Sequence, residues 1–108
     1  MFNKKKELFI KKAASEHVPG ENEKIFWRTH AVERLRERKF KKNEIEESLK
    51  KCVLVEDYPN CLVLSYVGIR AVHVVVDIDM NNCRLFIITL YEPDDRWEDD
   101  RKRRKSKG

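Results

Sequence analysis

Cysteine is scarce in this sequence, and no two cysteines stand at the spacing of a metal-binding pair. The 108 residues include three cysteines, Cys52, Cys61 and Cys83, which is an odd number and contains no C-x-x-C motif. This pattern argues against a disulfide scaffold and against a closed zinc site, and it is typical of proteins from a reducing compartment. We therefore expect no metal or other cofactor, and we interpret the cysteines as small hydrophobic residues of the fold.

Long hydrophobic runs are also missing. The N-terminal stretch MFNKKKELFIKKAAS begins with basic residues, as a secretion signal does, but its apolar run LFI is too short for one. No stretch approaches the roughly 18 apolar residues of a membrane-spanning helix. The chain contains neither internal repeats nor a linker long enough to divide it. We therefore expect a single cytoplasmic domain with no membrane partner.

Charged residues, in contrast, are abundant. They make up 40% of the chain, well above the usual proportion of about a quarter. The net charge is +5, which favours polyanionic partners such as RNA, DNA or an acidic protein. The hydrophobic fraction of 41% still suits a folded protein with one modest core.

Helical patterns occupy the first half of the chain. Residues 3–17 predict a short basic helix, which the Pro19–Gly20 pair ends. Residues 23–29 predict a short strand or an extended segment. Thr29 is the expected N-cap of a helix over residues 30–38. A further amphipathic helix is expected to begin at Asn43 as its cap, because apolar residues then recur at i, i+4 and i+7.

Strand patterns dominate after residue 52. Apolar runs separated by turn residues predict an antiparallel meander. The expected strands cover residues 53–58, 61–67, 70–79 and 83–92, and the turns lie at Pro59–Asn60, Gly68 and Asn81–Asn82. Because helices precede strands, the expected class is α+β, with two helices packed on a small antiparallel sheet.

The chain is expected to divide into three parts. Residues 1–22 form an N-terminal basic extension that includes the basic helix, and residues 23–100 form the domain. The final segment, RKRRKSKG at residues 101–108, contains no apolar residue and is interpreted as a disordered basic tail. The tail is either a solubilising segment or an electrostatic arm that gathers RNA.

The stretch RTHAVERLRERKF places a histidine beside arginines on one helix. At about 100° per residue, His30, Arg34 and Arg38 fall within an arc of about 80° next to the apolar stripe. An arginine fork can hold a phosphate and a nearby histidine can move a proton, so this edge is a candidate phosphate site. The alternative is a solvated face on which the arginines pair with Glu33 and Glu37.

A second histidine interrupts the strand at residues 70–79. His73 shares one face of that strand with Ala71, Val75 and Asp77. The other face is wholly apolar and should meet the helices. We expect His73 on the opposite, more open face, toward Arg84 and Phe86. The alternative is a structural histidine.

The segment after the last strand, TLYEPDDRW, offers aromatic residues beside the basic tail. Tyr91 and Trp97 could stack on bases, or Trp97 could instead seal the edge of the core. Asp99 and Asp100 do not form a metal pair, since they adjoin arginines and no third ligand is evident.

Four motifs in order resemble a known family of small prokaryotic proteins. They are T-H-A-x-E-R-x-x-E-R at 29–38, Y-P-x-C-L-V-L at 58–64, H-V-V-V-D at 73–77, and I-I-T-x-Y-x-P-D-x-x-W at 87–97. The sequence resembles the family DUF4258, a domain of unknown function, over roughly residues 27–100. One departure is Lys39–Phe40, where members often have a glycine that ends the helix in a left-handed turn.

That family is similar to the RelE/ParE-like toxins, which have a RelE-like α+β fold. The resemblance implies a toxin-like, metal-independent endoribonuclease of a prokaryotic toxin–antitoxin pair. Its partners would be RNA and a cognate antitoxin, often a small zinc-finger protein. The alternatives are a non-catalytic RNA- or protein-binding module of the same fold, and a gyrase-inhibitor-type toxin.

The resemblance also implies roles for individual residues. His30 or His73 would be the base, Arg34 and Arg38 would hold the phosphate, and Tyr91 would position or donate a proton. The expected RNA-binding residues are Trp97, Arg84, Arg101, Arg103 and Arg104.

Overall fold

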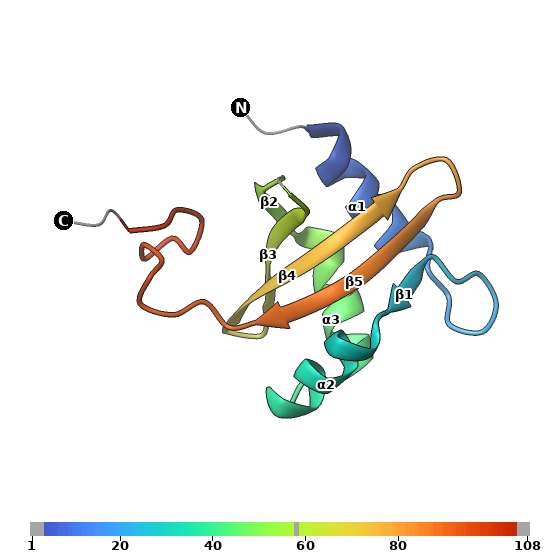
Figure 1. The fold of residues 1–108 in the computed structure, drawn as a ribbon. Coiled ribbons are helices and arrows are strands. Elements are labelled where there is room, and N and C mark those ends of the chain that lie inside the picture. The colour runs from blue at the N-terminus through green and yellow to red at the C-terminus, as the bar shows by residue number, and fades with distance from the viewer. Residues whose placement is uncertain (1–3, 58, 106–108) are drawn as a thin grey trace.

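The computed structural model describes residues 4–57 and 59–105, and it confirms the α+β class. Figure 1 shows a single sheet whose helices gather on one side. The elements, in chain order, are α1 (Lys4–Glu16), β1 (Ile25–Trp27), α2 (Thr29–Glu37), α3 (Lys42–Ser48), a 3₁₀ turn η1 (Leu49–Lys51), β2 (Val53–Glu56), β3 (Cys61–Val67), β4 (Arg70–Asp79) and β5 (Arg84–Tyr91). No helix among these described residues is long and apolar enough to cross a membrane.

The sheet is mixed, so the expectation of a purely antiparallel sheet is wrong. Its strand order is β1-β5-β4-β3-β2, and β2 to β5 form the predicted antiparallel meander. The added strand β1 pairs parallel to β5, with Phe26 opposite Phe86. β1 leads directly into α2, and α2 packs against β5. Because β1 and β5 run in the same direction, α2 begins toward the end of β5.

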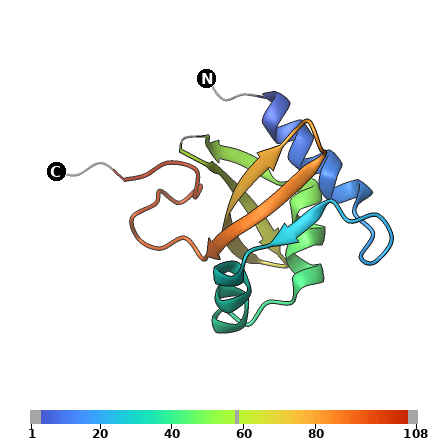
Figure 2. The same cartoon turned by 45° about the vertical axis from the view of Figure 1, so that its right-hand side comes forward.

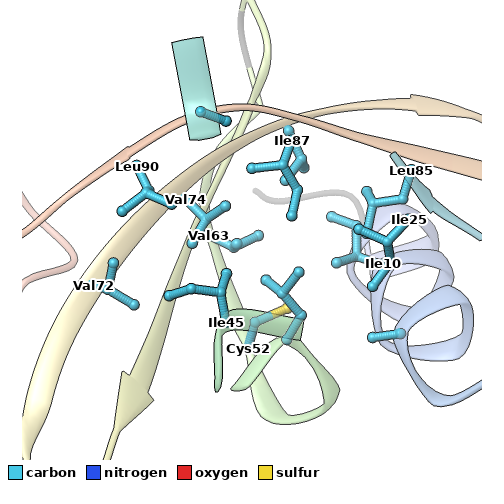
Figure 3. Close-up of a cluster of buried hydrophobic side chains, with 14 of the residues drawn as sticks. Ile10, Ile25, Ile45, Cys52, Val63, Val72, Val74, Leu85, Ile87 and Leu90 are labelled. Atoms are coloured by element: carbon cyan, nitrogen blue, oxygen red, sulfur yellow. The ribbon is translucent and has the colours of Figure 1, made fainter. Parts of the chain in front are cut away.

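Three helices, rather than the two expected, cover one face of the sheet. Helix α1 buries Ile10, Ala13 and Ala14, so the basic N-terminal helix contributes to the core. Figure 3 shows the centre of this core, where Ile45 and Cys52 face the sheet residues Val63 and Val74. The apolar face of β4 meets the helices, as its sequence predicts.

A β-bulge in β5 decides which side chains leave the core. Val75 pairs with Thr89 but Val76 pairs with Ile87, so Ile88 has no partner on β4. The extra residue shifts the alternation, and Leu90 is therefore buried against the helices. Tyr91 consequently points to the opposite face of the sheet, where it packs with a separate cluster. We call this opposite face the outer face.

The predicted helix caps are both wrong. Arg28, not Thr29, is the N-cap of α2: its backbone is extended and its carbonyl oxygen accepts from the N–H of Val32 at 3.1 Å. Lys41, not Asn43, is the N-cap of α3, and its N–H donates to the Glu44 carboxylate at 2.8 Å. The Arg28 N–H donates to the Ile87 carbonyl, so Arg28 is the last residue held by the sheet. Helix α2 begins directly after it, one residue earlier than expected.

Helix α2 ends in the left-handed turn that a glycine would favour, although a lysine stands there. Lys39 has φ of 60°. Its N–H donates to the Arg36 carbonyl at 3.1 Å and the Phe40 N–H donates to the Leu35 carbonyl at 3.0 Å, which is the Schellman arrangement. A lysine therefore stands in this turn with the left-handed backbone that a glycine would favour.

Replacing Lys39 with glycine should stabilise the protein by about 1 kcal/mol, because a side chain at positive φ is strained. The thermal midpoint should rise by about 4–8 °C. The matched control is Arg38→Gly, since Arg38 has φ of −90° and gains nothing from glycine. Thermal unfolding followed by circular dichroism measures both variants. A Lys39→Gly midpoint at or below that of the wild type would contradict the strained turn.

Candidate functional site

The chain after β5 folds back over the outer face. Figure 2 shows this segment on the side of the sheet away from α1 and α3. Trp97 is 4% exposed and packs on Val55, Leu62 and Leu64. Of the two expectations for this tryptophan, sealing an edge of the core is confirmed. Base stacking by Trp97 would require this segment to move.

The structure describes residues 101–105 of the expected disordered tail, and residues 106–108 lie outside the described residues. Two backbone hydrogen bonds hold the end of the segment. The Glu98 N–H donates to the Arg103 carbonyl at 2.7 Å, and the Lys105 N–H donates to the Arg96 carbonyl at 2.8 Å. Residues 101–105 contain no apolar residue, and their backbone and guanidinium groups make the contacts instead.

His73 is buried beneath this segment, and the expectation that it lies on an open face is therefore wrong. Its ring is 0% exposed and lies 5.3 Å from the ring of Tyr91 and 4.4 Å from that of Trp97, both edge-on. Its Nε2–H donates to the Arg101 carbonyl oxygen at 2.7 Å. Its Nδ1 has no hydrogen-bond partner among the described residues. Burial lowers the pKa of His73, which favours a neutral ring.

The neighbours of His73 also differ from those expected. It faces the outer side as predicted, but its partner on β5 is Tyr91. Arg84 and Phe86 pair with Asp79 and Asp77, at the other end of the same two strands. Arg84 there donates to the Asp79 carboxylate at 2.9 Å, so it is remote in register from the histidine.

A small hollow opens beside this cluster and brings four polar side chains together. It has a volume of about 130 Å³, room for about four water molecules. Its polar side chains are Glu56, Asn60, Tyr91 and Arg104, and Leu62, Val75 and Pro59 complete its wall. A hollow of this size fits a phosphate group and is too small for a drug-sized ligand.

Three of the four polar groups of the hollow, a carboxylate, a guanidinium and a phenol, can move a proton or hold a phosphate. The Nε and Nη2 of Arg104 donate to the two oxygens of Glu56 at 3.0 and 3.4 Å, and its guanidinium lies 4.6 Å from the ring centre of Trp97. Burial raises the pKa of Tyr91, so its hydroxyl stays protonated at neutral pH. Glu56 was missed in the sequence, although an acid that ends an apolar strand is an available signal.

The candidate residues on α2 lie apart from this hollow and are solvated. The His30 side chain is 54% exposed, and its Nδ1 lies 3.9 Å from Glu33. Arg34 donates to Glu37 at 2.6 Å, which confirms the predicted i, i+3 pair. No hydrogen bond, ion pair or ring contact within residues 4–57 and 59–105 joins this helix edge to His73. The structure thus favours the solvated interpretation of His30 and Arg34.

The backbone of Arg38 is tied to the residue after Tyr91 through Arg70, which the sequence did not single out. The Nη2 of Arg70 donates to the Arg38 carbonyl oxygen at 2.8 Å and to Glu92 at 3.0 Å. Its guanidinium also lies 3.8 Å from the ring centre of Phe40. Arg70 therefore ties the end of α2 to the residue that follows Tyr91.

The remaining predicted residues serve mainly local contacts. The guanidinium of Arg101 donates to the Asp99 carbonyl at 3.1 Å, and Arg103 lies 3.3 Å from Asp100. Cys52 and Cys61 are buried, as expected of small hydrophobic residues, and burial raises the pKa of the Cys52 thiol to about 12. Cys83 is exposed. The described part of the chain holds no group of three potential metal ligands.

The fold and the hollow define a class: a small α+β domain with helices on one face of a mixed sheet and a polar hollow on the other. The family model for DUF4258, a domain of unknown function, matches residues 27–92, and the chain belongs to that family. The match includes Glu56, His73 and Tyr91 but ends before Trp97 and Arg104. Searches of curated proteins and of solved structures give no match.

Proposed function

We propose that this chain is a toxin-like, metal-independent endoribonuclease that acts at the hollow formed by Glu56, Tyr91 and Arg104. The observation that carries the proposal is the meeting of a carboxylate, a protonated phenol and a guanidinium in one hollow of phosphate size. Metal-free RNA cleavage needs a base, an acid and a cation at the phosphate, and these three groups supply them.

The proposed reaction is an internal transesterification. Glu56 takes the proton of a ribose 2′-OH, whose oxygen then attacks the adjacent phosphorus. The bond from phosphorus to the 5′ oxygen breaks, and Tyr91 gives its proton to that leaving oxygen. Arg104 leaves its ion pair with Glu56 and stabilises the charge on the phosphate. The products carry a 2′,3′-cyclic phosphate and a 5′-hydroxyl, and proton exchange with water restores Glu56 and Tyr91.

His73 takes a different role from the catalytic base that the resemblance suggests. Its protonated nitrogen is already engaged by the Arg101 carbonyl and its ring is closed to solvent. In the proposal His73 supports Tyr91 through their edge-on contact. The proposed partners are RNA and a cognate antitoxin, for which the resemblance suggests a small zinc-finger protein.

A non-catalytic RNA-binding module is the second candidate. The ion pair between Arg104 and Glu56 favours it over catalysis, since Glu56 is engaged by Arg104 and is not free to meet a 2′-OH. A module that only binds needs the guanidinium and not the carboxylate, whereas the ribonuclease needs both. RNA cleavage itself therefore separates the two candidates.

Purified protein should cleave single-stranded RNA in excess chelator, and Arg104→Gln should lower the rate by about 10²–10³-fold, as expected for loss of one stabilising donor. Arg103→Gln is the matched control, because Arg103 is an exposed arginine of the same segment that pairs with Asp100. Gel assays of labelled RNA give both rates, and circular dichroism checks the fold. An inactive wild type, or equal loss in both variants, would refute the assignment.

A further inference from the structure

A dense group of cations lies on the turn between α2 and α3 and on the helix ends that flank it. We call it the basic turn, and it consists of Arg36, Arg38, Lys39, Lys41 and Lys42. All five residues are exposed, and none forms an ion pair within the described part of the chain. The one acid between them, Glu37, is already paired with Arg34. The positive charge of the turn is therefore not neutralised locally.

The backbone of the basic turn is well defined. Phe40 lies within it and is 6% exposed, so it anchors the turn in the core. Arg70 stacks on the Phe40 ring and donates to the Arg38 carbonyl oxygen. A fixed backbone holds the neighbouring cations at set positions without further ordering when a ligand binds.

Lys39 provides an independent indication that the charge matters. It occupies a left-handed position, at φ of 60°, where glycine would be free of strain. The chain thus has a lysine at a position where the backbone geometry favours glycine. Backbone strain of this kind is concentrated at functional sites.

The basic turn is linked through Arg70 to the residue that follows Tyr91 of the proposed catalytic hollow. Arg70 joins the Arg38 carbonyl to Glu92, and Glu92 directly follows Tyr91. An RNA strand with one phosphate in the hollow that continues past Tyr91 toward Glu92 would bring neighbouring phosphates toward this turn.

We propose that the basic turn is a second contact for RNA, which holds the sugar–phosphate backbone beside the strand bound in the hollow. This inference rests on the proposed function for the position of the RNA. The turn offers cations and no exposed apolar side chain, since Phe40 is buried. Protein interfaces depend on buried apolar anchors, so this composition favours phosphates over an acidic protein. Contact through phosphates gives affinity without sequence preference.

The test is a binding measurement that does not depend on cleavage. Labelled single-stranded RNA with 2′-O-methyl riboses, which cannot be cleaved by the proposed reaction, is titrated at several salt concentrations. The variant Arg36→Gln/Lys39→Gln/Lys41→Gln removes three charges and leaves the strain at residue 39 in place. The control Lys4→Gln/Lys12→Gln/Lys51→Gln removes three exposed charges from α1 and η1.

The slope of log affinity against log salt should shrink by up to about 2 units in the turn variant, at about 0.7 per lost phosphate contact. The control should keep the wild-type slope. Equal slopes in both variants would overturn the proposal. Displacement of the RNA by polyglutamate at equal charge concentration would also overturn it, because that result would indicate an acidic protein partner. If the wild type fails to cleave ordinary RNA, the proposed function fails while the slopes still decide this inference.

Discussion

Replacing Trp97 with alanine is expected to lower the free energy of unfolding by about 3–5 kcal/mol, the range for large buried aromatic side chains. Trp97 is 4% exposed and packs on Leu62 and Leu64, and its ring lies 4.4 Å from that of His73. Its loss would leave a cavity and would open the buried histidine to water. Urea denaturation followed by circular dichroism gives the free energy.

Ile69→Ala is the matched control for this prediction. Ile69 is a large apolar residue that is 98% exposed, so its truncation should change stability by no more than about 0.5 kcal/mol. A loss below about 1 kcal/mol for Trp97→Ala would contradict the account. It would mean that the C-terminal segment contributes little to the fold and that Arg104 is not held at the hollow.

The second large effect concerns Glu56. Glu56→Gln should lower the rate of RNA cleavage by about 10²–10⁴-fold, the range for one general base. The amide has the shape of the carboxylate and can still accept from Arg104, but it cannot take the proton of a 2′-OH. Single-turnover assays in excess chelator measure the rate.

Glu47→Gln is the control for Glu56→Gln. Glu47 is exposed and pairs with Lys50 at 2.9 Å, so the change has the same chemistry at a site away from the hollow. The control should retain the wild-type rate. If Glu56→Gln also retains it, the base lies elsewhere and the catalytic hollow is wrongly placed.

Much of the fold follows from local patterns in the sequence. The strands at residues 61–67 and 70–79 were predictable because apolar runs end at turn residues, and the wholly apolar face of β4 does meet the helices. The parallel pairing of β1 was not predictable, because three residues carry no signal for strand direction. The bulge at Ile88 also has no clear local signal, and it places Tyr91 on the outer face.

The candidate site was predictable only in part, because it depends on contacts between distant segments. The outward face of His73 follows from strand alternation, but its burial depends on Trp97 returning from the end of the chain. Arg104 and Glu56 are 48 residues apart, and no periodic pattern links them. The residues of the helix edge at His30 are close in sequence, so their pattern is easily found there. Such pairs often remain on a solvated face, as His30 and Glu33 do.

The central claim is that the outer face cleaves RNA by attack of the 2′-OH, with Glu56, Tyr91 and Arg104 as the reacting groups. The most direct measurement is the chemistry of the product ends after incubation of a single-stranded RNA with the protein in excess chelator. The account predicts a 2′,3′-cyclic phosphate on one product and a 5′-hydroxyl on the other, and no cut after a nucleotide that lacks its 2′-OH. Intact RNA, or products with 5′-phosphate ends, would contradict it.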